Sequence, residues 1–185
     1  MWLLVGLGNP GSRYARTRHN IGFLVIEELA GREGLEFREK ADYKICDGSI
    51  EGERIAIMEP LMFMNRSGSA VRRVVARFAI PPEKIIVVHD DLDLETGTLK
   101  VRKKGSSGGH KGVESIIQSI GSADFIRVKV GIGRDRLMPV DKYVLSRFTK
   151  EELPLVKQAL GRAADSIPFI ISEGVEKAMN KFNKN

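Results

Sequence analysis

The sequence predicts an α/β fold, namely a single domain with a twisted mixed β-sheet flanked by helices. Short runs rich in β-branched residues alternate with segments of helical periodicity along the 185 residues, a pattern typical of layered α/β domains. The stretch from Tyr43 to Met58 turns near Gly52 and indicates a β-hairpin, so the sheet is expected to be mixed rather than wholly parallel. Because no repeat, linker or low-complexity tract is found, we expect residues 1–185 to form one domain.

The individual elements are predicted from local patterning. Apolar runs bounded by turn residues predict strands at residues 3–7, 43–50, 54–58, 85–88, 99–103 and 126–132. Apolar residues at helical spacing predict helices at residues 20–30, 67–78 and 109–120, followed by a long C-terminal segment from about residue 151. Near that segment, Thr149 with Glu152 resembles a capping box. Pro168 is expected to bend or break the last helix, and Gly174 to end one part of it.

The composition is that of a globular, mildly basic protein. The formal net charge is +6 and the pI about 9.5, values that favour a polyanionic partner without requiring one. Cys46 is the only cysteine, so no internal disulfide can form, and we expect a cytoplasmic location. Residues 1–7 are too short for the core of a signal peptide, and no stretch approaches the ~20 apolar residues of a membrane span. We therefore expect no membrane association.

A glycine-rich turn follows the first expected strand. Gly6-x-Gly8-x-x-Gly11 matches the dinucleotide-binding fingerprint, but that fingerprint also requires a helix at the second glycine and a second strand ending in an acid. Pro10 lies inside the turn, and residues 35–40 do not form an apolar strand that ends in Asp or Glu. We infer a tight turn that uses the conformational freedom of glycine.

Polar residues precede two expected helices, and each has two interpretations. His19 and Asn20 come just before the helix that begins near Ile21. Either could cap it, and an imidazole at this boundary is also a natural general base for activating water. Asn65 and Ser67 precede the next helix. They could cap that helix, or the amide of Asn65 could donate a hydrogen bond to a developing oxyanion. The sequence alone does not separate these interpretations.

Acidic residues follow the apolar strand at residues 85–88, in the order His89-Asp90-Asp91-Leu92-Asp93. Acids at the carboxyl end of such a strand bind Mg²⁺, orient a histidine or form a turn. Asp93 fits the turn, because Glu95-Thr96-Gly97 follows it. Asp90 is nearest the strand end, and we favour it as a site residue.

Basic residues cluster between Lys100 and Lys111, where a strand, a flexible loop and a helix are expected in turn. Backbone N–H groups at a helix start form a phosphate site together with nearby ammonium groups; the alternative is an exposed loop that binds nothing. The loop is not a Walker A motif, because His110 replaces the required glycine and Gly112 replaces Ser or Thr. Arg127 and Lys129 on a later strand add charge of the same sign.

Taken together, these segments resemble the bacterial-type peptidyl-tRNA hydrolases. The matching pieces are VGLGNPGSRYARTRHNIG, FMNRSG, HDDLDLETG, GGHKGVESI, KVGIGR and DKYVLSRF, in that order over most of the chain. The resemblance implies an α/β fold, a monomer, and an enzyme that cleaves the ester joining a peptide to the terminal ribose of tRNA.

The resemblance also implies roles for single residues. His19 corresponds to the catalytic histidine and Asp90 to the acid that holds and polarises it, while Asn9 and Asn65 correspond to asparagines of the reaction centre. The implied substrate contacts are Tyr14 with the terminal nucleotide, Met64 on the peptide side, His110 at the cleft loop, and Lys100, Arg102 and Lys129 on the tRNA-facing surface. On this basis we expect direct attack by water activated by His19, with no metal, no other cofactor and no covalent intermediate.

One position departs from the family pattern. The residue after the cleft histidine is usually Asn and is Lys111 here. An ammonium group has three donors and no acceptor, so any role that needs the amide oxygen is lost. Lys111 remains a candidate for substrate binding, with a phosphate as an alternative contact.

Two other functions stay open on charge and periodicity alone. One is a metal-dependent phosphoesterase that uses Asp90, Asp91 and His110. The other is a non-catalytic RNA-binding protein in which the histidines and asparagines are helix caps. The first predicts sensitivity to a chelator, and the second predicts tRNA binding without ester cleavage.

Overall fold

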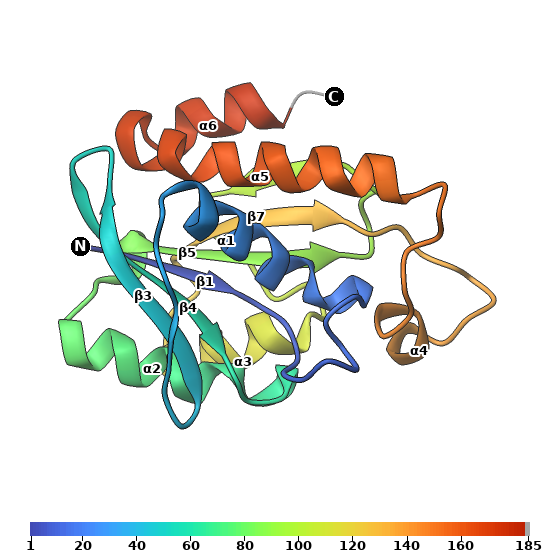
Figure 1. Ribbon diagram of the computed structural model, residues 1–185, viewed down its shortest axis with the longest axis horizontal. Coiled ribbons are helices and arrows are strands. Elements are labelled where there is room, and N and C mark those ends of the chain that lie inside the picture. The colour runs from blue at the N-terminus through green and yellow to red at the C-terminus, as the bar shows by residue number, and fades with distance from the viewer. Residues whose placement is uncertain (184–185) are drawn as a thin grey trace.

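A seven-stranded mixed sheet forms the centre of the computed structural model, which describes residues 1–183 (Figure 1). The strands lie in the order β2-β3-β4-β1-β5-β7-β6. Their bounds are β1 Trp2–Gly6, β2 Arg38–Glu39, β3 Tyr43–Ile50, β4 Glu53–Pro60, β5 Ile85–Asp91, β6 Leu99–Arg102 and β7 Ile126–Gly131. β4, β1, β5 and β7 are parallel, whereas β2, β3 and β6 pair antiparallel with their neighbours. The expected mixed sheet and the hairpin, β3–β4, are confirmed.

Helices cover both faces of this sheet. The α-helices are α1 Ile21–Arg32, α2 Ser67–Phe78, α3 Lys111–Ile120, α4 Val140–Val144, α5 Leu153–Glu173 and α6 Val175–Phe182. Three short 3₁₀ turns are η1 Arg18–Asn20, η2 Met64–Arg66 and η3 Pro82–Lys84. One apolar core lies beneath α1, α5 and α6, and a second lies beneath α2 and α3 (Figure 1). No helix among residues 1–183 is long and apolar enough to cross a membrane.

Several element boundaries differ from the predictions for local reasons. The expected helix at 109–120 begins only at Lys111, because Gly108 and Gly109 have φ values of 58° and 84° that a right-handed helix does not contain. The short elements β2 and α4 were not predicted. Residues 184 and 185 of the predicted domain lie outside the described residues.

The C-terminal helix also differs in part from its prediction. α5 continues through Pro168 to Glu173, so the expected break there is wrong. The neighbouring Ile167 and Ile170 are buried in the core, and this packing keeps the helix continuous despite the lost hydrogen bond. Gly174, with φ of 89°, does end the helix. The reciprocal bonds of the predicted capping box are present, although α5 begins only at Leu153.

Glycines allow α1 to lie directly on the ends of two parallel strands. A Cβ atom on Gly22 would meet the carbonyl oxygen of Val88 and would lie 2.5 Å from the backbone nitrogen of Leu7. Gly6 faces Gly22, and Gly8 faces the ring of Phe23 at 2.7 Å. The dinucleotide-like pattern therefore serves helix–strand packing at these two positions. The same close approach brings η1, which carries His19, to the carboxyl end of β5.

The β6–β7 edge of the sheet carries basic side chains on one face. Alternate residues of these strands, such as Val101 and Val128, point into the core beneath α5 and α6. The opposite face therefore carries Lys100, Arg102, Arg127 and Lys129, of which Arg127 is buried. The core beneath α2 and α3 draws its strand residues from β1, β3, β4 and β5. The two halves of this face consequently differ, one being apolar and helix-covered and the other basic.

Replacing Gly22 by alanine is expected to push α1 away from the sheet. Because the obstructing atoms are backbone, the strain cannot be relieved by a rotamer change, and we expect a loss of about 2–3 kcal/mol in the free energy of unfolding. Gly31 lies in the same helix with open space at its Cβ position, so Gly31→Ala is the matched control and should stabilise by about 0.5–1 kcal/mol. Urea unfolding of both variants measures this, and equal effects would contradict the role of Gly22.

Candidate active site

A cleft of about 760 Å³ opens at the carboxyl edge of the parallel strands. Its walls come from the loop after β1, from η1 and η2, from the end of β5, from residues 107–111 and from α4. This edge is where open α/β sheets place their binding sites. Of the predicted site residues, the cleft lining includes Asn9, His19, Met64, Asn65, Asp90, His110, Lys111 and Lys129.

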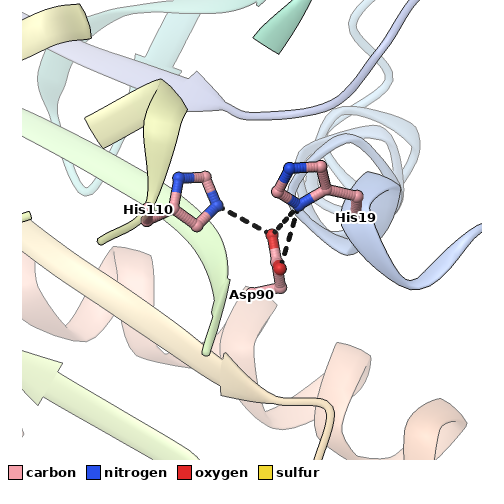
Figure 2. A group of neighbouring side chains, drawn as sticks. All are labelled: His19, Asp90 and His110. Carbon is pink, nitrogen blue, oxygen red and sulfur yellow. Dashed lines mark hydrogen bonds and ion pairs between the residues drawn. The ribbon is translucent and has the colours of Figure 1, made fainter. Parts of the chain in front are cut away.

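Three predicted residues meet at one carboxylate. Figure 2 shows His19 and His110 approaching Asp90 from different elements, η1 and the start of α3. His19 Nδ1 lies 2.8 Å from Oδ1 and 3.0 Å from Oδ2 of Asp90, and His110 Nε2 lies 2.8 Å from Oδ1. Burial alone would raise the pKa of Asp90, but the imidazoles of His110 and His19 outweigh burial and hold this pKa well below its usual range. Asp90 is therefore a buried carboxylate anion.

The hydrogen-bond network assigns a tautomer to each imidazole. His110 Nδ1 accepts from the backbone N–H groups of Gly112 and Val113, at 3.2 and 3.3 Å. Its Nε2 therefore carries the hydrogen and donates to Asp90. His19 Nδ1 faces the same anion and must also donate, so the neutral ring keeps its lone pair on Nε2.

His89 is a buried member of the site that the sequence analysis did not single out. Its Nδ1 donates to the carbonyl oxygen of Asp90 at 2.7 Å, and its ring lies 4.7 Å from that of His110 in an edge-on arrangement. Burial lowers the pKa of His89 to about 3. His89 therefore stays neutral and packs against His110 at the wall of the cleft. Its position at the end of an apolar strand, directly before Asp90, is the sequence feature that could have indicated this role.

Asn9 presents a free amide nitrogen to the cleft. Its backbone exchanges two hydrogen bonds with the side chain of Asn20, both of 2.9 Å, and its Oδ1 accepts from the backbone nitrogen of Met64 at 2.9 Å. Within residues 1–183 its Nδ2 forms no hydrogen bond, and this group is left to donate. Asn20 and Asn65 make no capping bond, so the capping interpretation is wrong for both.

The rim of the cleft contains further candidates for substrate contact. Met64 is buried and Asn65 is exposed, and both line the cleft from η2. Tyr14 lies outside the lining and packs edge-on against Phe63, with ring centroids 6.4 Å apart. Phe63 lines the cleft with 59% of its surface exposed, a place at the site that its sequence neighbourhood did not predict.

The predicted basic residues fall into two groups. Lys129 lines the cleft and pairs with Asp91 at 3.0 Å, whereas Lys100 and Arg102 lie outside the lining, on the neighbouring strand β6. Arg127 was expected to add charge of the same sign, but its side chain is only 1% exposed and so offers no contact at the surface.

Arg127 instead anchors the loop that leads to His110. It donates to the carbonyl oxygens of Ala123 and Phe125, at 3.2 and 3.0 Å, and to that of Gly105. A buried guanidinium is tolerated there because several backbone acceptors converge on it.

The residues that could hold a metal are the same three that meet at the carboxylate. One ligand atom each of His19, Asp90 and His110 lies within 4.8 Å of the others. Both imidazole nitrogens that face Asp90 carry hydrogens in the network above, so metal binding would require both to lose them. Asp91 belongs to no such cluster in the part of the chain that the structure describes. The structure therefore does not bring Asp90, Asp91 and His110 together as a group of metal ligands.

Arg18 fixes the turn that carries His19. Its guanidinium forms two 2.7 Å bonds with the carboxylate of Glu152 and stacks over the ring of Tyr143, 4.4 Å from the centroid. It also donates to the carbonyl oxygen of Ile132 at 3.3 Å. These contacts tie η1 to α4 and to the start of α5.

The fold and site define an α/β protein with an imidazole–carboxylate pair in a cleft at the carboxyl edge of its sheet. The chain belongs to the peptidyl-tRNA hydrolase family, since the family model described as "Peptidyl-tRNA hydrolase" matches residues 3–185.

Individual relatives agree with this assignment. The peptidyl-tRNA hydrolase of Thermodesulfovibrio yellowstonii is 50% identical over 186 residues, with 100% of both chains covered. That of Chloroflexus aggregans is 47% identical, with 99% of both chains covered. The crystal structure of the Acinetobacter baumannii peptidyl-tRNA hydrolase superimposes with a TM-score of 0.94 at 35% identity, covering 99% of this chain and 94% of that one.

Removal of the Arg18 guanidinium is expected to damage both stability and catalysis. Arg18→Ala leaves Glu152 partly buried without its partner, and we expect a loss of about 3–5 kcal/mol in the free energy of unfolding. Turnover should fall as well, because the turn that carries His19 loses its support. Arg16 is exposed two residues earlier, so Arg16→Ala is the control and should change stability by less than about 0.5 kcal/mol. Similar unfolding curves for the two variants would rule out this role of Arg18.

Proposed function

We propose that this protein hydrolyses the ester between a peptide and the terminal ribose of peptidyl-tRNA, the activity that the family name denotes. The observation that carries the proposal is the His19–Asp90 pair, which lies in a large cleft beside the free amide nitrogen of Asn9. We further propose that the enzyme acts as a monomer in the cytoplasm.

His19 is the proposed general base. With its Nδ1 hydrogen donated to Asp90, the Nε2 lone pair is available to take a proton from water as that water attacks the ester carbonyl. The ring becomes an imidazolium in this step, and the Asp90 carboxylate stabilises the new charge at hydrogen-bond distance. No covalent enzyme intermediate is needed, because water itself is the nucleophile.

Asn9 and Asn65 are the proposed donors to the tetrahedral intermediate. The Nδ2 group of Asn9 is held in position by three hydrogen bonds to the rest of that residue, so little reorganisation is required when charge develops. One such donor contributes roughly 2.7–4 kcal/mol to transition-state stabilisation in hydrolases. The exposed Asn65 faces the same cleft and would orient the carbonyl.

The proposed partner, peptidyl-tRNA, extends from the cleft onto the basic edge of the sheet. Lys100, Arg102 and Lys129 would contact phosphates there without reading sequence. Tyr14 and Phe63 offer aromatic surfaces for the terminal nucleotide, and Met64, His110 and Lys111 face the peptide side.

Substitutions of the acid–base pair test the chemistry. His19→Ala is expected to lower turnover of N-acetyl-Phe-tRNA by about 10²–10⁴-fold while the Kd for tRNA stays nearly unchanged. Asp90→Asn should lower turnover by a smaller factor, because the amide would favour the wrong tautomer of His19. Release of labelled N-acetyl-Phe measures both effects. Wild-type turnover by His19→Ala would refute the assignment of the base.

The same assay separates the alternative functions. EDTA should leave the rate unchanged, whereas a metal-dependent phosphoesterase would lose activity. Tight tRNA binding with no release of N-acetyl-Phe would identify a non-catalytic RNA-binding protein. Unblocked Phe-tRNA is the specificity control and should be cleaved poorly.

The basic edge is tested by the salt dependence of tRNA binding. Arg102→Ala should weaken binding of several different tRNAs by a similar factor and reduce the slope of log K against log salt by about 1. Arg72 is an exposed arginine on α2, so Arg72→Ala removes the same charge elsewhere and should leave the slope unchanged. Equal slopes for wild type and Arg102→Ala would place the tRNA on another surface.

A further inference from the structure

A second, smaller hollow lies beside the cleft, between η2 and α3. Its volume is about 340 Å³. Besides the backbone of Gly109, its lining consists of the polar residues Asn65, Ser107, Lys111, Glu114, Ser115 and Gln118. Each lining side chain ends in a polar group, and several reach it through an aliphatic stem, so the hollow suits a chain that offers both hydrogen-bonding groups and apolar surface.

This hollow continues the cleft rather than standing apart from it. Asn65, Ser107, Gly109 and Lys111 line both spaces. A chain bound in the cleft beside Asn65 can therefore run on into the hollow without crossing a wall.

None of the basic residues proposed to meet tRNA phosphates lines this hollow. Its lining comes from Asn65 on η2, from Ser107 and Gly109 in the loop after β6, and from four residues of α3. Lys129 lines only the cleft, and Lys100 and Arg102 line neither space. If tRNA phosphates occupy the β6–β7 edge, the hollow is left for the peptide on the other side of the scissile ester.

Lys111 carries the only positive charge among the lining residues of the hollow. It is exposed, and within residues 1–183 it forms no ion pair. The one acidic residue of the lining, Glu114, already accepts a hydrogen bond from Gln118 at 3.0 Å. Because Lys111 also lines the cleft, its ammonium group stands where a chain passes from one space to the other.

We propose that this hollow binds the part of the peptide that precedes the esterified residue, and that Lys111 selects an acidic side chain at the position directly before that residue. The inference rests on the proposed function and adds a preference within its substrates. The hydrogen-bonding groups of an amide chain match the polar lining, and a carboxylate matches the unpaired ammonium group of Lys111. The expected preference is about two- to five-fold, the size of a solvent-exposed ion pair.

The test compares two substrates that differ only in charge, N-acetyl-Glu-Phe-tRNA and N-acetyl-Gln-Phe-tRNA. For the wild type, kcat/KM should be about two- to five-fold higher for the Glu substrate, and the ratio should fall at high salt. Lys111→Arg should keep the ratio, Lys111→Gln should bring it to about one, and Lys111→Glu should bring it below one. Lys157 is exposed on α5, so Lys157→Gln is the matched control and should keep the wild-type ratio.

The ratio of kcat/KM between the two substrates does not change when a variant is partly unfolded or when His110 is displaced, because both substrates are affected equally. Equal kcat/KM values for the two substrates in the wild type, or an unchanged preference in Lys111→Gln, would overturn the inference while N-acetyl-Phe-tRNA is still hydrolysed. Failure to hydrolyse any N-blocked substrate, N-acetyl-Phe-tRNA included, would instead overturn the proposed function.

Discussion

The buried carboxylate of Asp90 is the group on which the arrangement of the cleft depends. An anion removed from water must be compensated by donors, and here two imidazole N–H groups supply them at 2.8 Å. This requirement orients both rings and decides their tautomers. The orientations of both rings thus follow from the need to compensate one desolvated charge.

Backbone and core features bring the two histidines to this carboxylate. Gly22 allows α1 to touch the ends of β1 and β5, and Arg18 ties the adjoining turn to Glu152. On the other side, the amide groups at the start of α3 hold His110, while Arg127 fixes the preceding loop through Gly105. Much of the support for the site therefore consists of residues that never face the cleft.

The sequence predicted elements and site residues wherever a local pattern was sufficient. The helix Ser67–Phe78 and the strand Tyr43–Ile50 match their predicted bounds, because periodicity and turn residues mark both of their ends. The five-residue α4 is too short to show a helical period, and continuity through Pro168 depends on tertiary packing. His19 and Asp90 were predicted as neighbours through the family resemblance. The roles of His89, Arg18 and Arg127 depend on burial and on contacts distant in sequence, which no local pattern encodes.

The three histidines of the chain meet at this site, yet only one can act as a base toward the cleft. The lone pair of His110 is occupied by the amide groups of Gly112 and Val113, so taking up a proton would break the cap of α3. His89 is buried, and its pKa near 3 keeps it neutral at physiological pH. Within residues 1–183, His89 Nε2 also lacks a hydrogen-bond partner, but it is enclosed by the protein. His19 combines a free Nε2 with its bond to Asp90. In the proposed mechanism, a proton taken from water would therefore stay on His19, beside the carboxylate that stabilises it, until the leaving ribose oxygen accepts it.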